Sequence, residues 1–297
     1  MEFLRRALNP WGEDVPIGVS WDLIWAAVII GAIFVVGHAL MVPKKVATGE
    51  IDEDEAKGLP EKLQRHTPGA RGFHWSMSIA MFALLITAFF PVVGIQFPWV
   101  TIHWIAGVLL ILTVIYHIYH VFAKQDFWTM WIDRRDIAEG KQGLKAALGR
   151  PEGKRPRSGK YPVDQKMFHH AAMVVTLGAV VTGVLMMFRI ENFLLPMNTY
   201  LFSDAAWGWV YVIHGVSGIG LIFLVIAHVY FAIRPEKRWM TWSMINGWID
   251  RDRYLENHDP ERWVVPEQGS ASELEASASG GGGGQAAVSD RVRGEGP

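Results

Sequence analysis

The 297-residue sequence predicts an all-α integral membrane protein that crosses the bilayer five times. Hydrophobic residues make up 51% of the chain and charged residues only 19%. The apolar residues are concentrated in five segments, each close to the roughly 20 residues that a helix needs to span a bilayer. A segment such as "VVTLGAVVTGVLMMF" has no polar face, which a helix of a soluble protein would need. The expected spans are 22–42, 73–93, 103–123, 168–188 and 208–233.

The first expected span, 22–42, is interpreted as a helix that stays in the chain and not as a cleaved signal peptide. Residues 1–21 precede it and are mostly non-apolar, and no small-x-small cleavage motif follows Val36. Lys44 and Lys45 come directly after it, as in a stop-transfer flank. Residues 1–21 are therefore expected to form a separate segment outside the membrane.

Lysine and arginine are unevenly distributed among the segments that join the expected spans. The 43–72 segment carries six of them and the 124–167 segment eleven, whereas 94–102 has none and 189–207 has only Arg189. Positively charged short loops stay on the cytoplasmic side of a membrane. Both basic segments are therefore predicted to be cytoplasmic, with the N-terminus outside a bacterial inner membrane and the C-terminus inside.

The C-terminal part of the chain is divided into two segments by composition. Residues 234–266 are expected to form a cytoplasmic segment. Residues 267–297 are rich in Gly, Ser and Ala, without apolar periodicity, and are predicted to be disordered. The net charge of −1 does not indicate a nucleic-acid partner.

Four histidines form two pairs with the same spacing. His214 and His228 bound "HGVSGIGLIFLVIAH", and His103 and His117 bound "HWIAGVLLILTVIYH". Fourteen residues of helix turn about 1400°, close to four full turns, so the members of each pair share one helix face at depths about 21 Å apart. The chain has no cysteine, which excludes iron–sulfur clusters, thiolate zinc sites and covalently attached haem.

A glycine follows each leading histidine by four residues: Gly107 follows His103, and Gly218 follows His214. A glycine one turn from a ligand leaves room for the edge of a flat macrocycle. Ionisable side chains inside a membrane are costly and are functional by default. The pattern predicts two stacked b-type haems, each held by two imidazoles and suited to electron transfer rather than to oxygen binding.

Depth in the membrane limits which histidines can share a haem. His103 and His214 lie within about a turn of the outer ends of their spans and are expected to hold an outer haem. His228 lies about 27 Å from the outer end of its span, and two candidates lie at a similar depth, His74 at about 28 Å and His117 at about 24 Å. Helix geometry alone leaves both open as the partner of His228.

Five motifs occur in a fixed order: "RGFHW" (71–75), "HWIAG" (103–107), "GKYPVDQKM" (159–167), "VTGV" (181–184) and "IHGVSGIGLIFLVIAHVYFA" (213–232). Through them the chain resembles the cytochrome b (gamma) subunit of membrane-bound formate dehydrogenase. This family lies within a wider di-haem cytochrome b group that includes nickel–iron hydrogenase cytochrome b. The resemblance covers Arg71 to about Trp263.

The resemblance implies a four-helix bundle over 73–233 that holds two bis-histidine haems, with the 22–42 span as an addition. It also implies that the histidine of "RGFHW", His74, is a ligand, which favours His74 over His117 as the partner of His228. Pro162 departs from the family pattern, because the family can place Asn at this position.

The function implied by the resemblance is electron transfer within a complex. Electrons would pass from an iron–sulfur subunit, through the two haems, to a quinone. A separate catalytic subunit with molybdenum or tungsten would oxidise formate, so no substrate-oxidising site is expected in this chain. Three alternatives stay open: the cytochrome b of a nickel–iron hydrogenase, that of a thiosulfate- or tetrathionate-type reductase, and a haem-free membrane anchor or transporter.

A quinone site is predicted where the basic segment meets the fourth expected span, in "GKYPVDQKMFHH". A quinone needs hydrogen-bond donors and a proton path from the cytoplasm. The candidate side chains are Asp164, Gln165, Lys166, His169 and His170.

The remaining histidines have simpler interpretations. His38 on the first span is expected to be structural. His66 and His258 lie in polar segments and are expected to be solvated.

Overall fold

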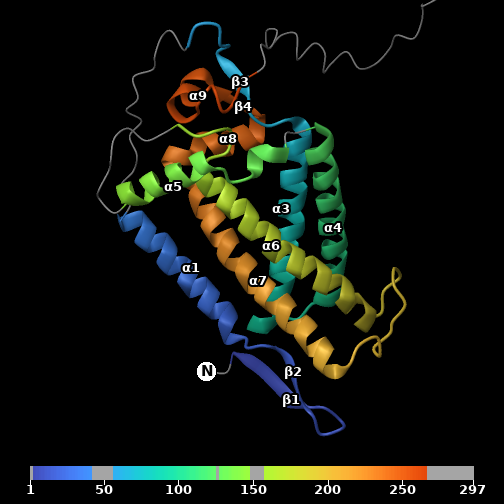
Figure 1. Ribbon diagram of the computed structural model, residues 1–297. Helices are drawn as coiled ribbons and strands as arrows, with labels where there is room; N and C mark the ends of the chain where they lie inside the picture. The colour runs from blue at the N-terminus through green and yellow to red at the C-terminus, as the bar shows by residue number, and fades with distance from the viewer. Residues whose placement is uncertain (1–2, 42–55, 125–126, 148–156, 266–297) are drawn as a thin grey trace, which may run out of the picture.

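The computed structural model describes residues 3–41, 56–124, 127–147 and 157–265, and it is mostly helical. Its five long helices are each long and apolar enough to cross a membrane, which confirms the predicted fold class. They are α1 (Asp22–Met41), α3 (Pro68–Phe89), α4 (Trp99–Lys124), α6 (Val163–Met186) and α7 (Asp204–Ile233) (Figure 1). The 3-10 turns η1 (Phe90–Val93) and η3 (Met187–Arg189) extend α3 and α6.

Four helices, α3, α4, α6 and α7, begin four or five residues before the expected spans, and in α3 and α7 a capping residue starts the helix in polar sequence. The Thr67 hydroxyl accepts a hydrogen bond from the Ala70 N–H, and Pro68 occupies the first turn of α3. The Ser203 hydroxyl accepts from the Ala206 N–H at the start of α7. Both helices are therefore longer than their apolar segments.

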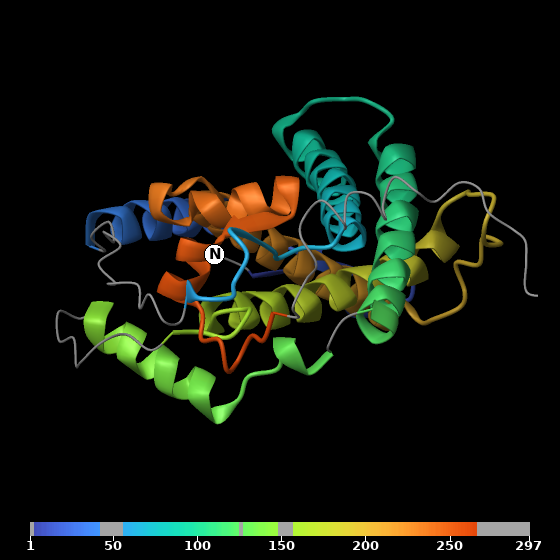
Figure 2. The ribbon, with the colours of Figure 1, turned by 90° about the horizontal axis from the view of Figure 1, so that it is seen from above.

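The spans pack as two antiparallel pairs, α3 with α4 and α6 with α7, and α1 lies along α7. Ala80, Met81, Leu110 and Leu221 form the core between the pairs. Figures 1 and 2 place α1 and α4 on opposite sides of the bundle. Gly31 of α1 allows close approach, since a Cβ there would lie 3.0 Å from Ile226 of α7.

A β-hairpin precedes α1, in the segment expected only to lie outside the membrane. It pairs β1 (Leu4–Leu8) with β2 (Asp14–Val19), and β2 packs on the start of α7. Gly208 makes this contact possible, because a Cβ there would lie 1.9 Å from the Pro16 carbonyl oxygen.

A small folded cap covers the opposite end of the bundle (Figure 1). It contains a two-stranded sheet of β3 (Lys62–Gln64) and β4 (Trp248–Asp250), and a cluster of buried apolar side chains around Leu63 and Tyr254. Its other elements are η2 (Phe127–Met130), α5 (Arg134–Ala147), η4 (Pro235–Lys237), α8 (Arg238–Asn246) and α9 (Arg251–Asn257). The cap joins segments that the sequence presents as separate connections. The tail 267–297, predicted to be disordered, lies outside the described residues.

The expectation that His66 and His258 are solvated is wrong. Their exposed fractions are 8% and 0%. Burial, followed by the charge of Arg65, lowers the pKa of His66 to about 2 and that of His258 to about 3. Both side chains are therefore neutral members of the cap. Local polarity failed as a guide here because residues distant in sequence cover them.

Candidate functional site

The predicted outer pair of histidines faces across the bundle near the hairpin end. His103 extends from α4 and His214 from α7, with ring centres 6.2 Å apart and ring planes at 69°. Two imidazoles that bind one iron from opposite sides, with bonds of about 2 Å, have ring centres roughly 6 Å apart. The observed spacing fits such a pair.

The predicted inner pair has the same spacing. The ring centres of His74 on α3 and His228 on α7 are 6.2 Å apart, and the planes meet at 46°. Phe168 stacks on the His228 ring at 5.1 Å. The buried Nδ1 atom of His74 has no hydrogen-bond partner among the described residues.

His117, the alternative inner ligand, faces a different residue. Its ring stacks on Phe73 at 4.0 Å and lies 6.2 Å from the ring of His169 on α6. The structure therefore brings His74, and not His117, to His228. Ligation of iron by any of these histidines stays a prediction.

Two threonines orient the outer histidines, and they do so in the same way. The Thr87 hydroxyl donates to the Ala83 carbonyl at 2.7 Å, so its oxygen accepts from Nδ1 of His103 at 2.8 Å. The Thr182 hydroxyl donates to the Gly178 carbonyl at 2.5 Å and accepts from Nδ1 of His214 at 3.0 Å. Placing the proton on Nδ1 leaves the Nε2 lone pair of each ring available to a metal.

These threonines were missed by sequence reasoning. Each lies on the helix before its histidine, at separations of 16 and 32 residues. Because the two separations differ, the sequence shows no common threonine–histidine spacing. Only the packing of α3 on α4 and of α6 on α7 reveals that each threonine bonds to its histidine.

The glycines beside the outer pair leave space, as the sequence predicts. A Cβ at Gly218 would meet no atom within 4 Å, and one at Gly107 would touch only Leu84, at 4.0 Å. Facing imidazoles with free Nε2 atoms and open space beside them fit a flat macrocycle with a central metal.

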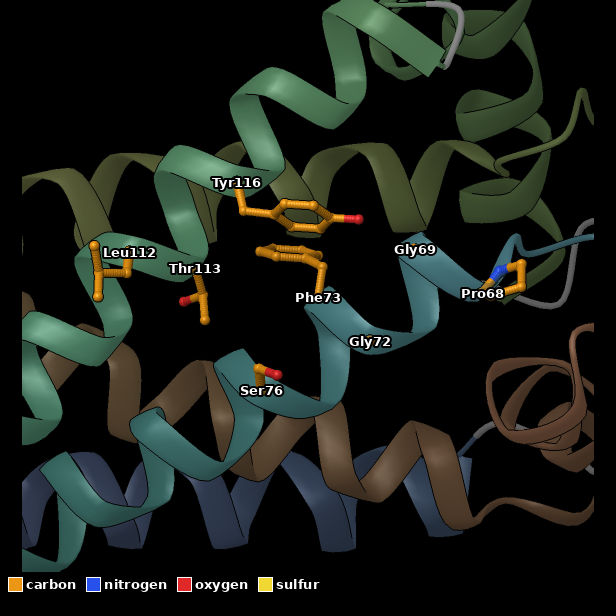
Figure 3. A pocket seen from close by; sticks show the side chains of 8 residues that line it. All are labelled: Pro68, Gly69, Gly72, Phe73, Ser76, Leu112, Thr113 and Tyr116. Carbon is orange, nitrogen blue, oxygen red and sulfur yellow. The ribbon is translucent and has the colours of Figure 1, made fainter. Parts of the chain in front are cut away.

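A groove of about 410 Å³ lies between α3 and α4 (Figure 3). Phe73 of α3 and Tyr116 of α4 line it with their rings, and Ser76 and Thr113 supply its hydroxyl groups. Phe73 is also the residue stacked on His117, so this groove adjoins His117 and not the pair of His74 and His228.

The predicted quinone residues lie at the cap end of α6, and most of them have protein partners. The Gln165 amide accepts from Arg65 at 3.3 Å and donates to the Met240 sulfur at 3.1 Å. Lys166 is 5% exposed and pairs with Asp136 at 2.7 Å. The ammonium group of Lys166 therefore forms a buried ion pair with Asp136.

The neighbouring side chains of this region are also placed by contacts. Asp164 pairs with Lys237 at 2.5 Å. The ring of His170 donates from Nδ1 to the Lys166 carbonyl and lies 5.9 Å from the ring of His169. His38, expected to be structural, bonds to Tyr230 at 3.0 Å and to Arg234 at 2.8 Å, and so ties α1 to the end of α7.

The fold and these facing histidines define a multi-pass helical membrane protein with space for cofactors in its core. Residues 65–247 match the family described as prokaryotic cytochrome b561, and the chain belongs to this family. The protein is therefore a membrane electron-transfer subunit of a family that carries b-type haem. The hairpin and α1 lie before the matched region. A comparison with curated proteins finds no match.

Substitution of the orienting threonines tests the geometry of the outer pair. We expect Thr87→Val and Thr182→Val each to lower haem affinity at the outer site about tenfold, because an unheld imidazole loses its orientation and tautomer. Haem retained per chain after detergent washing measures the effect. Thr113→Val is the matched control, since Thr113 bonds to the Leu110 carbonyl of its own helix. Equal retention in all three variants would contradict the orienting role.

Proposed function

We propose that this chain carries electrons through two b-type haems, from an iron–sulfur subunit of a formate dehydrogenase complex to the quinone pool. The observation that carries the proposal is the presence on α7 of two histidines, each facing a histidine of another helix at the same 6.2 Å spacing. The fourteen residues between His214 and His228 separate the two sites by about 21 Å across the membrane.

The haems would be held by His103 with His214 and by His74 with His228. An iron between two imidazoles supplies one-electron transfer and leaves no open position for oxygen. The protein contributes the orientation of the rings, the apolar surroundings, and the rigid helices that hold the ligands. Thr87 and Thr182 keep the outer imidazoles in the metal-binding tautomer.

The proposed orientation puts the hairpin outside a bacterial inner membrane and the cap in the cytoplasm. Lysine and arginine support it, because the segments at the cap end carry most of them while 94–102 has none and 189–207 only Arg189. The donor would then dock beside His103 and His214. Electrons would move towards His74 and His228, on the side from which a quinone takes its protons.

The identity of the donor rests on the resemblance of the motifs to formate dehydrogenase gamma subunits. This complex would include the iron–sulfur subunit and a catalytic subunit with molybdenum or tungsten. A nickel–iron hydrogenase or a thiosulfate- or tetrathionate-type reductase would use the same two sites with another partner. The electron donor that reduces the haems discriminates among them.

The quinone is proposed to bind at the cap end of α6, near Gln165 and His169. His169 lies beside His117, and Gln165 lies within hydrogen-bond distance of Arg65. Glu139 of α5, which packs on α6, is 2% exposed, and burial raises its pKa to about 7. A carboxyl group that exchanges a proton near neutral pH suits proton delivery from the cytoplasmic side.

The proposed function predicts the spectrum and the donor of the intact complex. Purified with its partners, the chain should contain two haems that acid–acetone extraction removes, because it has no cysteine for covalent attachment. Formate should reduce both, as recorded in the reduced-minus-oxidised visible spectrum. Reduction by hydrogen and not by formate would move the chain to a hydrogenase. A colourless protein would overturn electron transfer through haem.

The two pairs of histidines predict two separable losses of haem. His103→Ala and His214→Ala should each remove the outer haem. His74→Ala and His228→Ala should each remove the inner haem and abolish quinone reduction while the donor still reduces the outer one. Haem per chain and the visible spectrum report both effects, with His38→Ala as a control that keeps two haems. Loss of the inner haem in His117→Ala but not in His74→Ala would reverse the inner assignment.

Gln165→Ala tests the quinone site in the intact complex. We expect slower quinone reduction and weaker binding of a quinone-analogue inhibitor, with both haems still bound and reducible by the donor. Gln96→Ala, exposed in the 94–102 segment at the other end of the bundle, is the control. Unchanged kinetics in Gln165→Ala and His169→Ala would place the quinone elsewhere.

A further inference from the structure

Arg65 is a buried arginine at the cap end of the bundle, just before the first turn of α3. Its exposed fraction is 2%. Its backbone N–H donates to the Gly247 carbonyl at 2.8 Å, and the next residue but one, Thr67, caps α3. The side chain is thus held where the cap meets the membrane helices.

The guanidinium group of Arg65 is buried but has few hydrogen-bond partners. Nη2 donates to the Gln165 amide oxygen at 3.3 Å and to the Lys160 carbonyl at 3.4 Å, and the group lies 5.1 Å from the ring centre of Trp239. Nε and Nη1 have no hydrogen-bond partner in the part of the chain that the structure describes. Within the same residues, no carboxylate forms an ion pair with it. A buried charge without a counter-ion is strongly destabilising.

The surroundings of Arg65 add positive charge instead of neutralising it. After burial, the charges of Arg65, Lys160 and Arg71 lower the pKa of His66, so three cations act on one neutral ring. The Nε of Arg71 also has no partner within the described residues, while its Nη1 donates to the Ile245 carbonyl at 2.6 Å. Asp164 is the nearby carboxylate that acts on Arg65, and Lys237 pairs with it at 2.5 Å.

The inner histidine pair adjoins this cationic group. Arg71 precedes His74 by three residues, so the two share one face of α3. His74 is also among the groups that act on His66. An anion that reached from the space between His74 and His228 towards the cap would therefore meet Arg71 and Arg65.

We propose that Arg65 and Arg71 bind the two propionate carboxylates of the haem held between His74 and His228. This inference rests on the proposed function. A b-type haem carries both carboxylates on one edge. Guanidinium groups present paired N–H donors that match carboxylate geometry. The carboxylates would supply the counter-ion that the buried Arg65 lacks and a partner for the Nε of Arg71.

The pairing has a consequence for the redox chemistry of the chain. Reduction of the iron adds a negative charge, which a nearby cation stabilises. Arg65 and Arg71 would therefore raise the midpoint potential of the inner haem and favour the movement of electrons towards the quinone side.

The test is a redox titration of both haems in the intact complex. We expect Arg65→Gln to lower the midpoint potential of the inner haem and to leave that of the outer haem unchanged, whereas Arg65→Lys restores part of the shift. His228→Ala, which keeps only the outer haem, assigns the two potentials. Arg135→Gln, an exposed arginine on α5, is the matched control and should shift neither. Arg71→Gln provides a second variant if Arg65→Gln does not fold.

A second measurement probes the carboxylates directly. Haem-depleted complex is refilled with haem or with haem dimethyl ester, whose carboxylates are blocked. Wild-type protein should retain haem better than the ester at the inner site, and this preference should disappear in the double variant of Arg65 and Arg71.

Several results would overturn the inference. Unchanged potentials in both arginine variants would do so, as would equal retention of haem and its ester by the wild-type complex. Slower quinone reduction with unchanged potentials would assign the arginines to the quinone or to a lipid phosphate. Failure of electron transfer through haem looks different, because the wild-type complex would then lack the two haems, and failure of the formate assignment would change only the donor that reduces them.

Discussion

The structure depends on one constraint: a polar ring inside a bilayer is costly unless its nitrogens find partners. The outer histidines meet it on one side through Thr87 and Thr182, which turn both free nitrogens towards each other across the bundle. The arrangement of the four spans follows from this need, since each facing pair requires α7 to lie opposite a helix of the α3–α4 pair. The apolar residues around the pairs determine how closely the helices approach.

Much of this arrangement could be predicted from the sequence, because the bilayer imposes simple rules. Span length identified the five helices, and the fourteen-residue spacing placed two histidines on one face of α7. Helix depth alone admitted both His74 and His117 as partners of His228, and only the family motif favoured His74, whose ring lies 6.2 Å from that of His228. In the structure the two histidines differ in the neighbours that their rings face. The ring of His117 packs against Phe73 and lies near His169, and the ring of His74 lies near that of His228.

What could not be predicted depends on contacts between distant residues. The hairpin at the N-terminus has short strands, and its docking is visible only through Gly208, nearly two hundred residues later. In the cap, β3 pairs with β4, and the helices from α3 to α8 lie between these two strands in the sequence. The segments that form the cap therefore resemble separate polar loops in the sequence. Arg65 and His66 bond through their backbone N–H groups to Gly247 beside β4. His258 is covered by Trp239, Tyr254 and Trp263. Local composition carries no signal of this burial.

Helix α7 extends without interruption from Asp204 to Ile233 and contains no proline. It supplies one histidine to each pair, so both sites are attached to a single rigid rod. Electron tunnelling slows steeply as the gap between donor and acceptor widens. A distance fixed by the rise of one helix does not change when the other spans tilt or when a partner docks. The tunnelling rate between the two centres would therefore be insensitive to fluctuations of the surrounding membrane.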